Sequence, residues 1–273
     1  MNDGDAGERA AIERVDEPNT VASLTADLRD LGVEPGDAVL VHSSLSALGW
    51  TAGGPQAVVD ALRAAVTESG TLVLPTHTGQ YTDPADWSSP PVPESWVGTI
   101  RESMPPFRPA VTPTRGVGAV PECFRNYPDI VRSDHPTVSF AAWGAMADEV
   151  VADHPFDDGL GDGSPLARLY ERDADVLLLG VDHDVNTSFH LAEYRADVPA
   201  ERVARSAPVV RDGRRVRVEY EELEKSADDF EDLGADFERE VGPTTGQVGA
   251  ATARLASQRA LVDFAVDWLG ANR

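Results

Sequence analysis

Three short apolar runs constrain the fold of this chain most strongly, because each is typical of a buried β-strand. They lie at Asp37–Val41, Thr71–Leu74 and Val176–Val181. The first two flank a helical pattern that opens at Gly53-Gly54-Pro55, and a strand, a helix and a strand in this order predict a βαβ unit with parallel strands. The third run, VLLLGV, is continuous, as in a strand buried on both faces. The chain is therefore predicted to be an α/β protein.

The rest of the pattern favours one domain over residues 19–273. Residues 1–18 are polar and mostly charged, so we expect an acidic, disordered tail. Residues 79–118 are rich in Pro, Trp and Thr, and because disordered segments are poor in aromatic residues, we expect an ordered excursion over the sheet edge. Asp212-Gly213 between alternating residues predicts a β-hairpin. Apolar positions from Ala250 to Leu269 predict a final amphipathic helix.

Capping residues mark the starts of two helices. Thr20 precedes apolar positions that continue to Leu31, and Gly32 follows them, which predicts an N-cap and a glycine stop. Ser164-Pro165 has the N-cap and the N1 proline of a second helix. The bounds of both helices are therefore predicted from local sequence.

The acidic excess of the chain limits its partners. Asp and Glu number 47 against 23 Lys and Arg, for a net charge of −24, and Lys225 is the only lysine. A field of this sign repels nucleic acid and anionic membranes, and it attracts small cationic ligands. Because the excess runs along the whole chain, we interpret it as a surface adapted to high salt.

Cysteine content and hydropathy bear on the location of the protein. Cys123 is the only cysteine, which excludes an internal disulfide or a Cys-based zinc cluster. The acidic N-terminus lacks the apolar core of a signal peptide. No apolar run approaches the ~20 residues that a membrane-spanning helix needs. We therefore expect a cytoplasmic protein.

Polar side chains follow each of the three predicted strands. The clusters are His42-Ser43-Ser44, Thr76-His77-Thr78 and Asp182-His183-Asp184. In open α/β sheets, ligands bind in the crevice at the carboxyl ends of the strands. The three clusters are therefore expected to line one site.

Two interpretations of this edge remain open from the residues alone. In the first, the hydroxyls and backbone N–H groups of Ser43, Ser44 and Ser46 hold an anion, and Arg115-Gly116 adds a guanidinium and an approachable backbone. In the second, strand-end His and Asp side chains bind a metal ion, as in a metal-dependent hydrolase. The candidate ligands would be His42, His77, Asp182 and His183.

His154 and Glu193 are the candidates for acid–base chemistry. A histidine titrates near neutrality and can take a proton from an amine, and a carboxylate can orient its ring. His190 lies one helical turn before Glu193, but a lone pair at this spacing is common, and we interpret His190 as a packed core residue. The residues alone give no distance between His154 and Glu193.

Five motifs in order resemble the aminoglycoside 3-N-acetyltransferase family. They are VHSSLSALGW at 41–50, TPTRGVG at 112–118, RSDHP at 132–136, GDGSPL at 161–166 and TSFHLAEY at 187–194. The resemblance implies a three-layer α/β/α sandwich with a mixed, largely parallel central sheet, distinct from the GNAT fold. It also implies transfer of an acetyl group from acetyl-coenzyme A to the 3-amino group of a 2-deoxystreptamine aminoglycoside or a related amine, an antibiotic-resistance activity.

The resemblance assigns roles to individual residues. His154 is the expected general base, with Glu193 as the carboxylate that works with it or receives the substrate amine. The residues expected to bind the coenzyme are His42, Ser43, Ser44, Leu45, Ser46, Thr76, Thr114, Arg115, Gly116 and Val117. The residues expected to bind the cationic substrate are Asp83, Trp96, Glu102, Asp182, His183 and Asp184. No resident metal is expected. A metal-dependent hydrolase and a non-catalytic module that binds coenzyme A or a polycation stay as alternatives.

Overall fold

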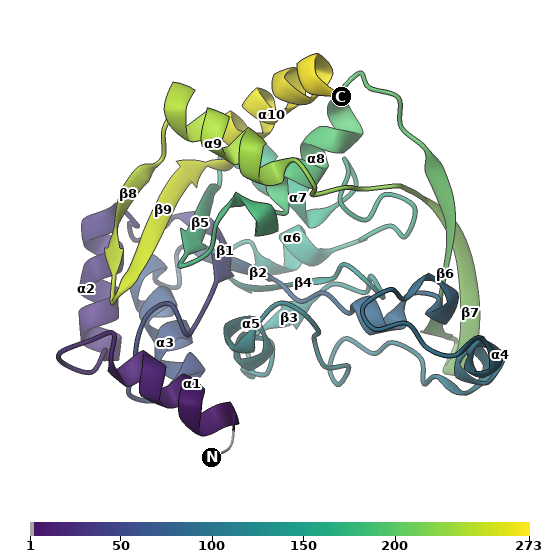
Figure 1. Ribbon diagram of the computed structural model, residues 1–273, viewed down its shortest axis with the longest axis horizontal. Coiled ribbons are helices and arrows are strands. Elements are labelled where there is room, and N and C mark those ends of the chain that lie inside the picture. Colours follow the sequence, from purple (N-terminus) through teal and green to yellow (C-terminus); the bar gives the residue numbers. More distant parts are fainter. Residues whose placement is uncertain (1–2) are drawn as a thin grey trace.

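The computed structural model describes residues 3–273 and contains a seven-stranded mixed sheet in the order β3-β4-β2-β1-β5-β9-β8 (Figure 1). Its three central strands are parallel: β2 (Thr71–Pro75), β1 (Ala38–Ser43) and β5 (Asp175–Leu179). The outer strands pair antiparallel: β3 (Val131–Arg132), β4 (Phe140–Gly144), β9 (Ala251–Ser257) and β8 (Thr244–Val248). The predicted α/β class and mixed sheet are confirmed, and parallel pairing is confined to the centre.

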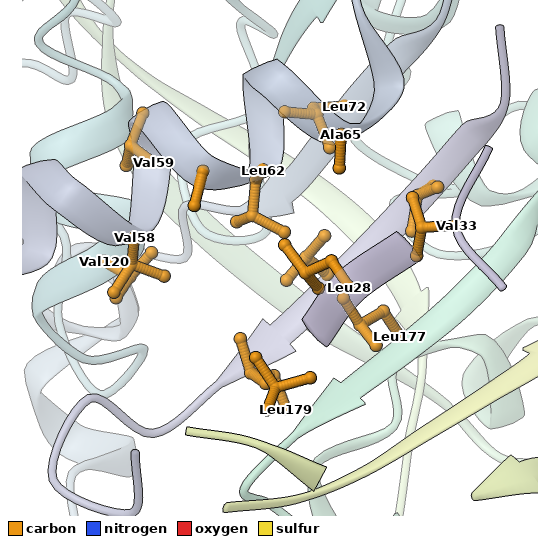
Figure 2. Packing of buried hydrophobic residues seen from close by; sticks show 14 of the residues in the cluster. Leu28, Val33, Val58, Val59, Leu62, Ala65, Leu72, Val120, Leu177 and Leu179 are labelled. Atoms are coloured by element: carbon orange, nitrogen blue, oxygen red, sulfur yellow. The ribbon is translucent and has the colours of Figure 1, made fainter. Parts of the chain in front are cut away.

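Helices cover both faces of this sheet, because alternate strand residues point to opposite sides. Val39 and Val41 of β1 join one buried cluster, and Leu40 between them joins the other. The first cluster packs under α2 (Val21–Leu31), α3 (Pro55–Val66) and α5 (Ala119–Phe124). Figure 2 shows Leu28 and Leu62 of these helices lying against the strands. Each fully buried leucine contributes about 1.5–3 kcal/mol.

The second cluster packs under helices at the opposite face of the sheet. They are α6 (Ala147–Val151), α7 (Pro165–Glu171), α8 (Ser188–Arg195), α9 (Phe230–Glu240) and α10 (Gln258–Asn272). Figure 1 shows α8, α9 and α10 together at one end of the molecule. The expected three-layer arrangement is present.

Both predicted helix starts are confirmed. The Ser23 backbone N–H donates to Thr20 Oγ1 at 3.1 Å, and Gly32 ends α2 with a φ of 113°. Ser164 caps α7 and Pro165 is its first residue. Local capping chemistry therefore sets these bounds.

Two segments differ from the sequence prediction. Residues 250–269 were expected to form one helix, but β9 takes up Ala251–Ser257 and α10 begins only at Gln258. Strand pairing on both sides, with β5 and β8, outweighs the helical pattern there. The tail expected to be disordered holds helix α1 (Asp3–Ile12). Trp50 anchors it, since its backbone N–H donates to the Ala11 carbonyl oxygen at 2.9 Å.

The 79–118 excursion is ordered and packs on a long hairpin, beside which Figure 1 shows α4. It contains η1 (Gly79–Tyr81), η2 (Pro84–Asp86) and α4 (Glu94–Ser103). The hairpin pairs β6 (Arg202–Arg211) with β7 (Arg214–Leu223) through Asp212 and Gly213, whose φ values of 49° and 72° suit the predicted turn. Just beyond it, Lys225 Nζ lies 2.7 Å from Glu222 Oε1.

Within residues 3–273, no helix is long and apolar enough to cross a membrane.

Replacing Gly144 tests the packing at the end of β4. Gly144 has a φ of 106°, and an added Cβ would meet the Gly70 carbonyl oxygen at 2.1 Å. We expect Gly144→Ala to lower the free energy of unfolding by at least about 1–3 kcal/mol, the usual cost of such strain. The control is Gly98→Ala in α4, where a Cβ meets nothing within 4 Å and helix propensity predicts a gain of up to about 1 kcal/mol. Urea unfolding of both variants checks this. Equal stabilities would contradict the close approach.

Candidate active site

A cavity of about 940 Å³ lies where the strand-end clusters meet. His42 and Ser43 at the end of β1, His77 after β2 and Asp184 after β5 all line it. Because β1, β2 and β5 are parallel, their carboxyl ends share one edge of the sheet. This is the edge at which ligands bind in open α/β sheets. The three polar clusters of the sequence therefore contribute to one site.

Glycine-rich backbone and hydroxyl groups form another part of the cavity wall. Gly53 and Gly54 have φ values of 94° and 58°, and no side chain caps the N-terminus of α3 that follows them. Ser44 Oγ and Ser46 Oγ lie 3.2 Å apart on the same wall. Uncapped helical N–H groups and the positive end of the helix dipole favour an anion. This wall suits a ligand that carries phosphate groups.

His190 and Glu193 form a hydrogen-bonded pair beside this wall. Both lie on α8, one turn apart, and His190 Nδ1 is 2.5 Å from Glu193 Oε2. His190 lines the cavity, while Glu193 is buried beneath it with 3% of its side chain exposed. An ionised carboxylate only accepts hydrogen bonds, so Nδ1–H is the donor. This fixes the tautomer and leaves the Nε2 lone pair available to take a proton.

Three donors keep Glu193 ionised. Besides His190, the Ser226 backbone N–H donates to Glu193 Oε1 at 3.1 Å, and Arg273 Nη1 donates to the same oxygen at 2.5 Å. Burial alone would raise the pKa of Glu193, but the hydrogen bonds from His190, Arg273 and Ser226 outweigh it, and the pKa lies below its usual value. Glu193 is thus a fixed negative charge behind the imidazole.

His42 and His77 bring two neutral rings to the cavity. Burial, with a smaller contribution from the nearby His190, lowers the pKa of each from 6.5 to about 3. His42 Nε2 lies 3.2 Å from Thr187 Oγ1, at the start of α8. These rings offer hydrogen bonds without positive charge, which suits the approach of a cationic substrate.

His154 is not part of this cavity. Its Nε2–H donates to the Gly159 carbonyl oxygen at 2.6 Å, and its Nδ1 accepts from the Ser133 hydroxyl at 2.9 Å. Burial lowers the pKa of His154 from 6.5 to about 4. Both ring nitrogens are thus engaged in holding the chain together. Of the two histidines, only His190, which the sequence suggested was a core residue, lines the cavity and bonds Glu193.

The comparisons with known proteins agree with the five motifs. A model of the family described as aminoglycoside 3-N-acetyltransferase matches residues 40–270. This range includes all of α8 and the whole sheet apart from the first two residues of β1. The chain belongs to the aminoglycoside 3-N-acetyltransferase family. The SPbeta prophage-derived aminoglycoside N(3')-acetyltransferase-like protein YokD of Bacillus subtilis (strain 168) is 48% identical over 259 residues, which cover 94% of each chain.

Solved structures of this family share the fold. The crystal structure of the YokD protein from Bacillus subtilis is 46% identical, with a TM-score of 0.94 over 97% of this chain and 98% of that one. AAC-IIIb, in a binary structure with CoASH, is 34% identical, with a TM-score of 0.82 over 93% and 97%. AAC-VIa, bound to sisomicin, is 33% identical, with a TM-score of 0.85 over 94% and 99%.

Most residues that the family resemblance assigned to the coenzyme line the cavity. They are His42, Ser43, Ser44, Leu45, Ser46, Gly116 and Val117. The other three lie behind the wall or beside it. Thr76 is buried and bonded to Ser139, Thr114 donates to Glu122 Oε2 at 2.8 Å, and the Arg115 backbone N–H donates to the His77 carbonyl oxygen at 2.9 Å. Thr114 and Arg115 position the glycine loop through these bonds.

Of the residues expected to bind the cationic substrate, only Asp184 lines the cavity. Asp83 is occupied by Arg101 and Arg217, at 2.6 and 2.5 Å. Asp182 pairs with Arg254 at 3.0 Å. These carboxylates therefore serve ion pairs of the fold.

The remaining three also lie outside the cavity. Trp96 and Glu102 are exposed on α4, and Trp96 is 58% exposed. The buried His183 ring stacks on Phe189, with the ring centroids 5.5 Å apart. Trp96 and Glu102 are thus exposed, His183 is packed in the core, and none of the three lines the cavity.

Sequence reasoning missed several lining residues. Helix α1 contributes Glu8, whose carboxylate accepts from Trp50 Nε1 at 3.2 Å, and both residues line the cavity. Composition alone placed Glu8 in a disordered tail, so no signal pointed to it. His190 had a visible signal, the three-residue spacing to Glu193. The residues that bind Glu193 from other parts of the chain, Ser226 and Arg273, were not visible in that spacing.

The metal interpretation of the strand-end histidines is not supported by the arrangement of the side chains. Across residues 3–273, no three His, Cys, Asp or Glu side chains gather in a group that could hold a metal ion. His183 stacks on Phe189 and Asp182 turns to Arg254, so neither joins His42 and His77 at the cavity.

The neutral state of His154 has a consequence for stability at acidic pH. Its folded pKa of about 4 lies below the unfolded value of 6.5, so the unfolded chain binds the proton first as the pH falls. Its contribution is therefore complete above pH 6.5 and is lost toward pH 4. Between pH 6 and 5, we expect the wild-type free energy of unfolding to fall more steeply than that of His154→Gln, by up to about 1.4 kcal/mol per pH unit. Urea unfolding at several pH values measures both slopes, and parallel slopes would contradict a neutral His154.

Proposed function

We propose that this chain transfers an acetyl group from acetyl-coenzyme A to an amine of an aminoglycoside, with His190 as the general base. The observation that carries the proposal is the meeting of two features in one cavity. One is a wall suited to a phosphate-bearing co-substrate, formed by Ser43–Ser46 and the N-terminus of α3. The other is an imidazole held by a buried carboxylate. Membership of the family and the CoASH-bound relative support the same reaction.

The His190–Glu193 pair would activate the acceptor amine. An aliphatic amine is largely protonated at neutral pH and cannot attack a thioester until it loses a proton. His190 Nε2 takes that proton, and Glu193 stabilises the imidazolium through the 2.5 Å hydrogen bond. General-base catalysis of this kind contributes about 10²–10⁴-fold. The amine nitrogen then bonds to the acetyl carbon and the C–S bond breaks. The thiolate takes the second proton that the nitrogen loses, and the imidazolium of His190 releases the first proton to solvent.

The cavity also suits the position of the co-substrate. Acetyl-coenzyme A supplies the activated acetyl group as a thioester. Ser44 and Ser46, with their hydroxyls, and the glycines Gly53 and Gly54 that lead into the uncapped N-terminus of α3 lie on the wall that would face its phosphates. Gly116 and Gly118, with φ values of 79° and 85°, let the backbone approach closely. Holding both substrates in one cavity supplies much of the remaining rate enhancement.

The acceptor is proposed to be a cationic aminoglycoside, acetylated at its 3-amino group. Asp184 and Glu8 are the carboxylates at the cavity, and the net charge of −24 favours the approach of a polycation. The sisomicin-bound structure of a 33% identical relative supports this substrate class. A panel of several aminoglycosides, tested as acceptors by thiol release in low and high salt, identifies the substrate. If none of the amines on the panel gives thiol release, the proposal is contradicted.

Replacing His190 and His154 one at a time by glutamine tests which histidine is the general base. We expect His190→Gln to lower kcat about 10²-fold or more, while calorimetry shows coenzyme A still bound. We expect the matched variant His154→Gln, which alters a ring outside the cavity, to keep kcat within about threefold once normalised to folded protein, because it removes no group that meets the substrates.

The opposite pattern would restore His154 as the base. Coenzyme binding without turnover in the wild-type protein would favour the alternative of a non-catalytic binding module.

A further inference from the structure

Arg273, which follows α10, lies behind the proposed catalytic pair. Its Nη1 donates to Glu193 Oε1 at 2.5 Å, on the side of the carboxylate opposite the His190 contact. The Arg273 side chain is 24% exposed and the Glu193 side chain is 3% exposed. The guanidinium therefore lies at the protein surface, and its charge reaches a buried carboxylate. It does not line the cavity.

A second carboxylate fixes the guanidinium in place. Arg273 Nε and Nη2 donate to the two oxygens of Asp229, at 2.7 and 2.6 Å, and Nη2 also donates to the Ser226 carbonyl oxygen at 2.9 Å. Such a two-point contact fixes both the position and the plane of the guanidinium. The same Ser226 gives its backbone N–H to Glu193. Arg273 thus joins α8, the segment before α9 and the end of α10.

The charge of Arg273 bears on the protonation of the pair. Burial works against an ionised Glu193, and the hydrogen bonds from His190 and Arg273 hold its pKa down. Without Arg273, the negative charge on Glu193 would be less compensated, and the pair would take up a proton more readily. The sign is the same whether that proton is assigned to the carboxylate or to the imidazole. A pair that already holds the proton cannot act as a base.

The other charged and titratable groups near the pair do not replace this contact. His42 at the end of β1 and His77 after β2 lie near His190, and burial keeps both rings neutral. Asp184 lines the same cavity and adds a negative charge. Asp229 is already paired with Arg273, which lowers the pKa of Asp229. In this set, Arg273 is the cation in contact with Glu193.

We propose that Arg273 is a positioning residue for catalysis, which keeps the His190–Glu193 pair unprotonated and correctly oriented at neutral pH. This inference rests on the proposed function, because it concerns the base of that reaction. Arg273 meets neither substrate and acts through Glu193. Its removal should therefore change kcat and the pH dependence, while the KM for acetyl-coenzyme A stays the same.

The test compares Arg273→Met, Arg273→Lys and a matched control, Arg259→Met. Arg259 lies at the start of α10, the helix that Arg273 follows, and its Nη2 lies 2.7 Å from Asp173 Oδ1, away from the cavity. We expect Arg273→Met to lower kcat about tenfold at pH 6.5 and to move the acid limb of the rate profile up by about one pH unit or more, as expected for loss of an adjacent opposite charge. Activity should approach the wild-type value near pH 9. Arg273→Lys should recover part of the loss, and Arg259→Met should match the wild type.

Two results would overturn the proposal. One is an unchanged profile in Arg273→Met, and the other is an equal loss at every pH, which would mean that Arg273 only stabilises the fold. Failure of the proposed function is distinguishable, because the wild-type protein would then release no thiol with any amine. In that event, NMR titration of the His190 ring protons in wild type and Arg273→Met gives the same comparison without an acceptor, and coincident curves would refute the role of Arg273.

Discussion

Parallel pairing of β1 with β2 and β5 is the interaction on which the site depends. It places the carboxyl ends of three strands at one edge of the sheet, so His42, His77 and Asp184 meet although they are separated in the chain. The antiparallel strands β4 and β9 flank this core and add no side chain to the cavity. Helices α3 and α8 then approach the same edge from opposite faces, one with its N-terminus and the other with His190.

Features set by neighbouring residues were predictable from the sequence. The Thr20 and Ser164 caps, the Asp212-Gly213 turn and the β1–α3–β2 unit each depend on a few adjacent side chains. Features set by distant partners were not. Residues 251–257 have apolar positions that fit a helix, and only the ladders to β5 and β8 make them a strand. Helix α1 likewise depends on Trp50.

The different surroundings of His154 and His190 have the same origin. Both histidines are near acidic residues in sequence, at Asp153 and Glu193, and the family resemblance drew attention to the segments that hold both. The two rings differ in the atoms around them. His154 contacts Ser133 and Gly159, whereas His190 contacts the Glu193 carboxylate, which is bound by Arg273 from a distant part of the sequence. A sequence gives the spacing of His190 and Glu193, but it does not give the contact that keeps Glu193 ionised.

The single lysine has a consequence for the chemical durability of the protein. An acetyl thioester reacts with unprotonated amines, and a protein that holds one close to its surface exposes its own lysines to modification. Here the only lysine side chain, Lys225, is 17% exposed, and its ammonium is paired with Glu222. The other basic side chains, apart from histidine, are arginines, whose guanidinium groups stay protonated and are poor nucleophiles. The chain therefore offers its own co-substrate almost no lysine to acetylate, and self-modification should not accumulate as the enzyme ages.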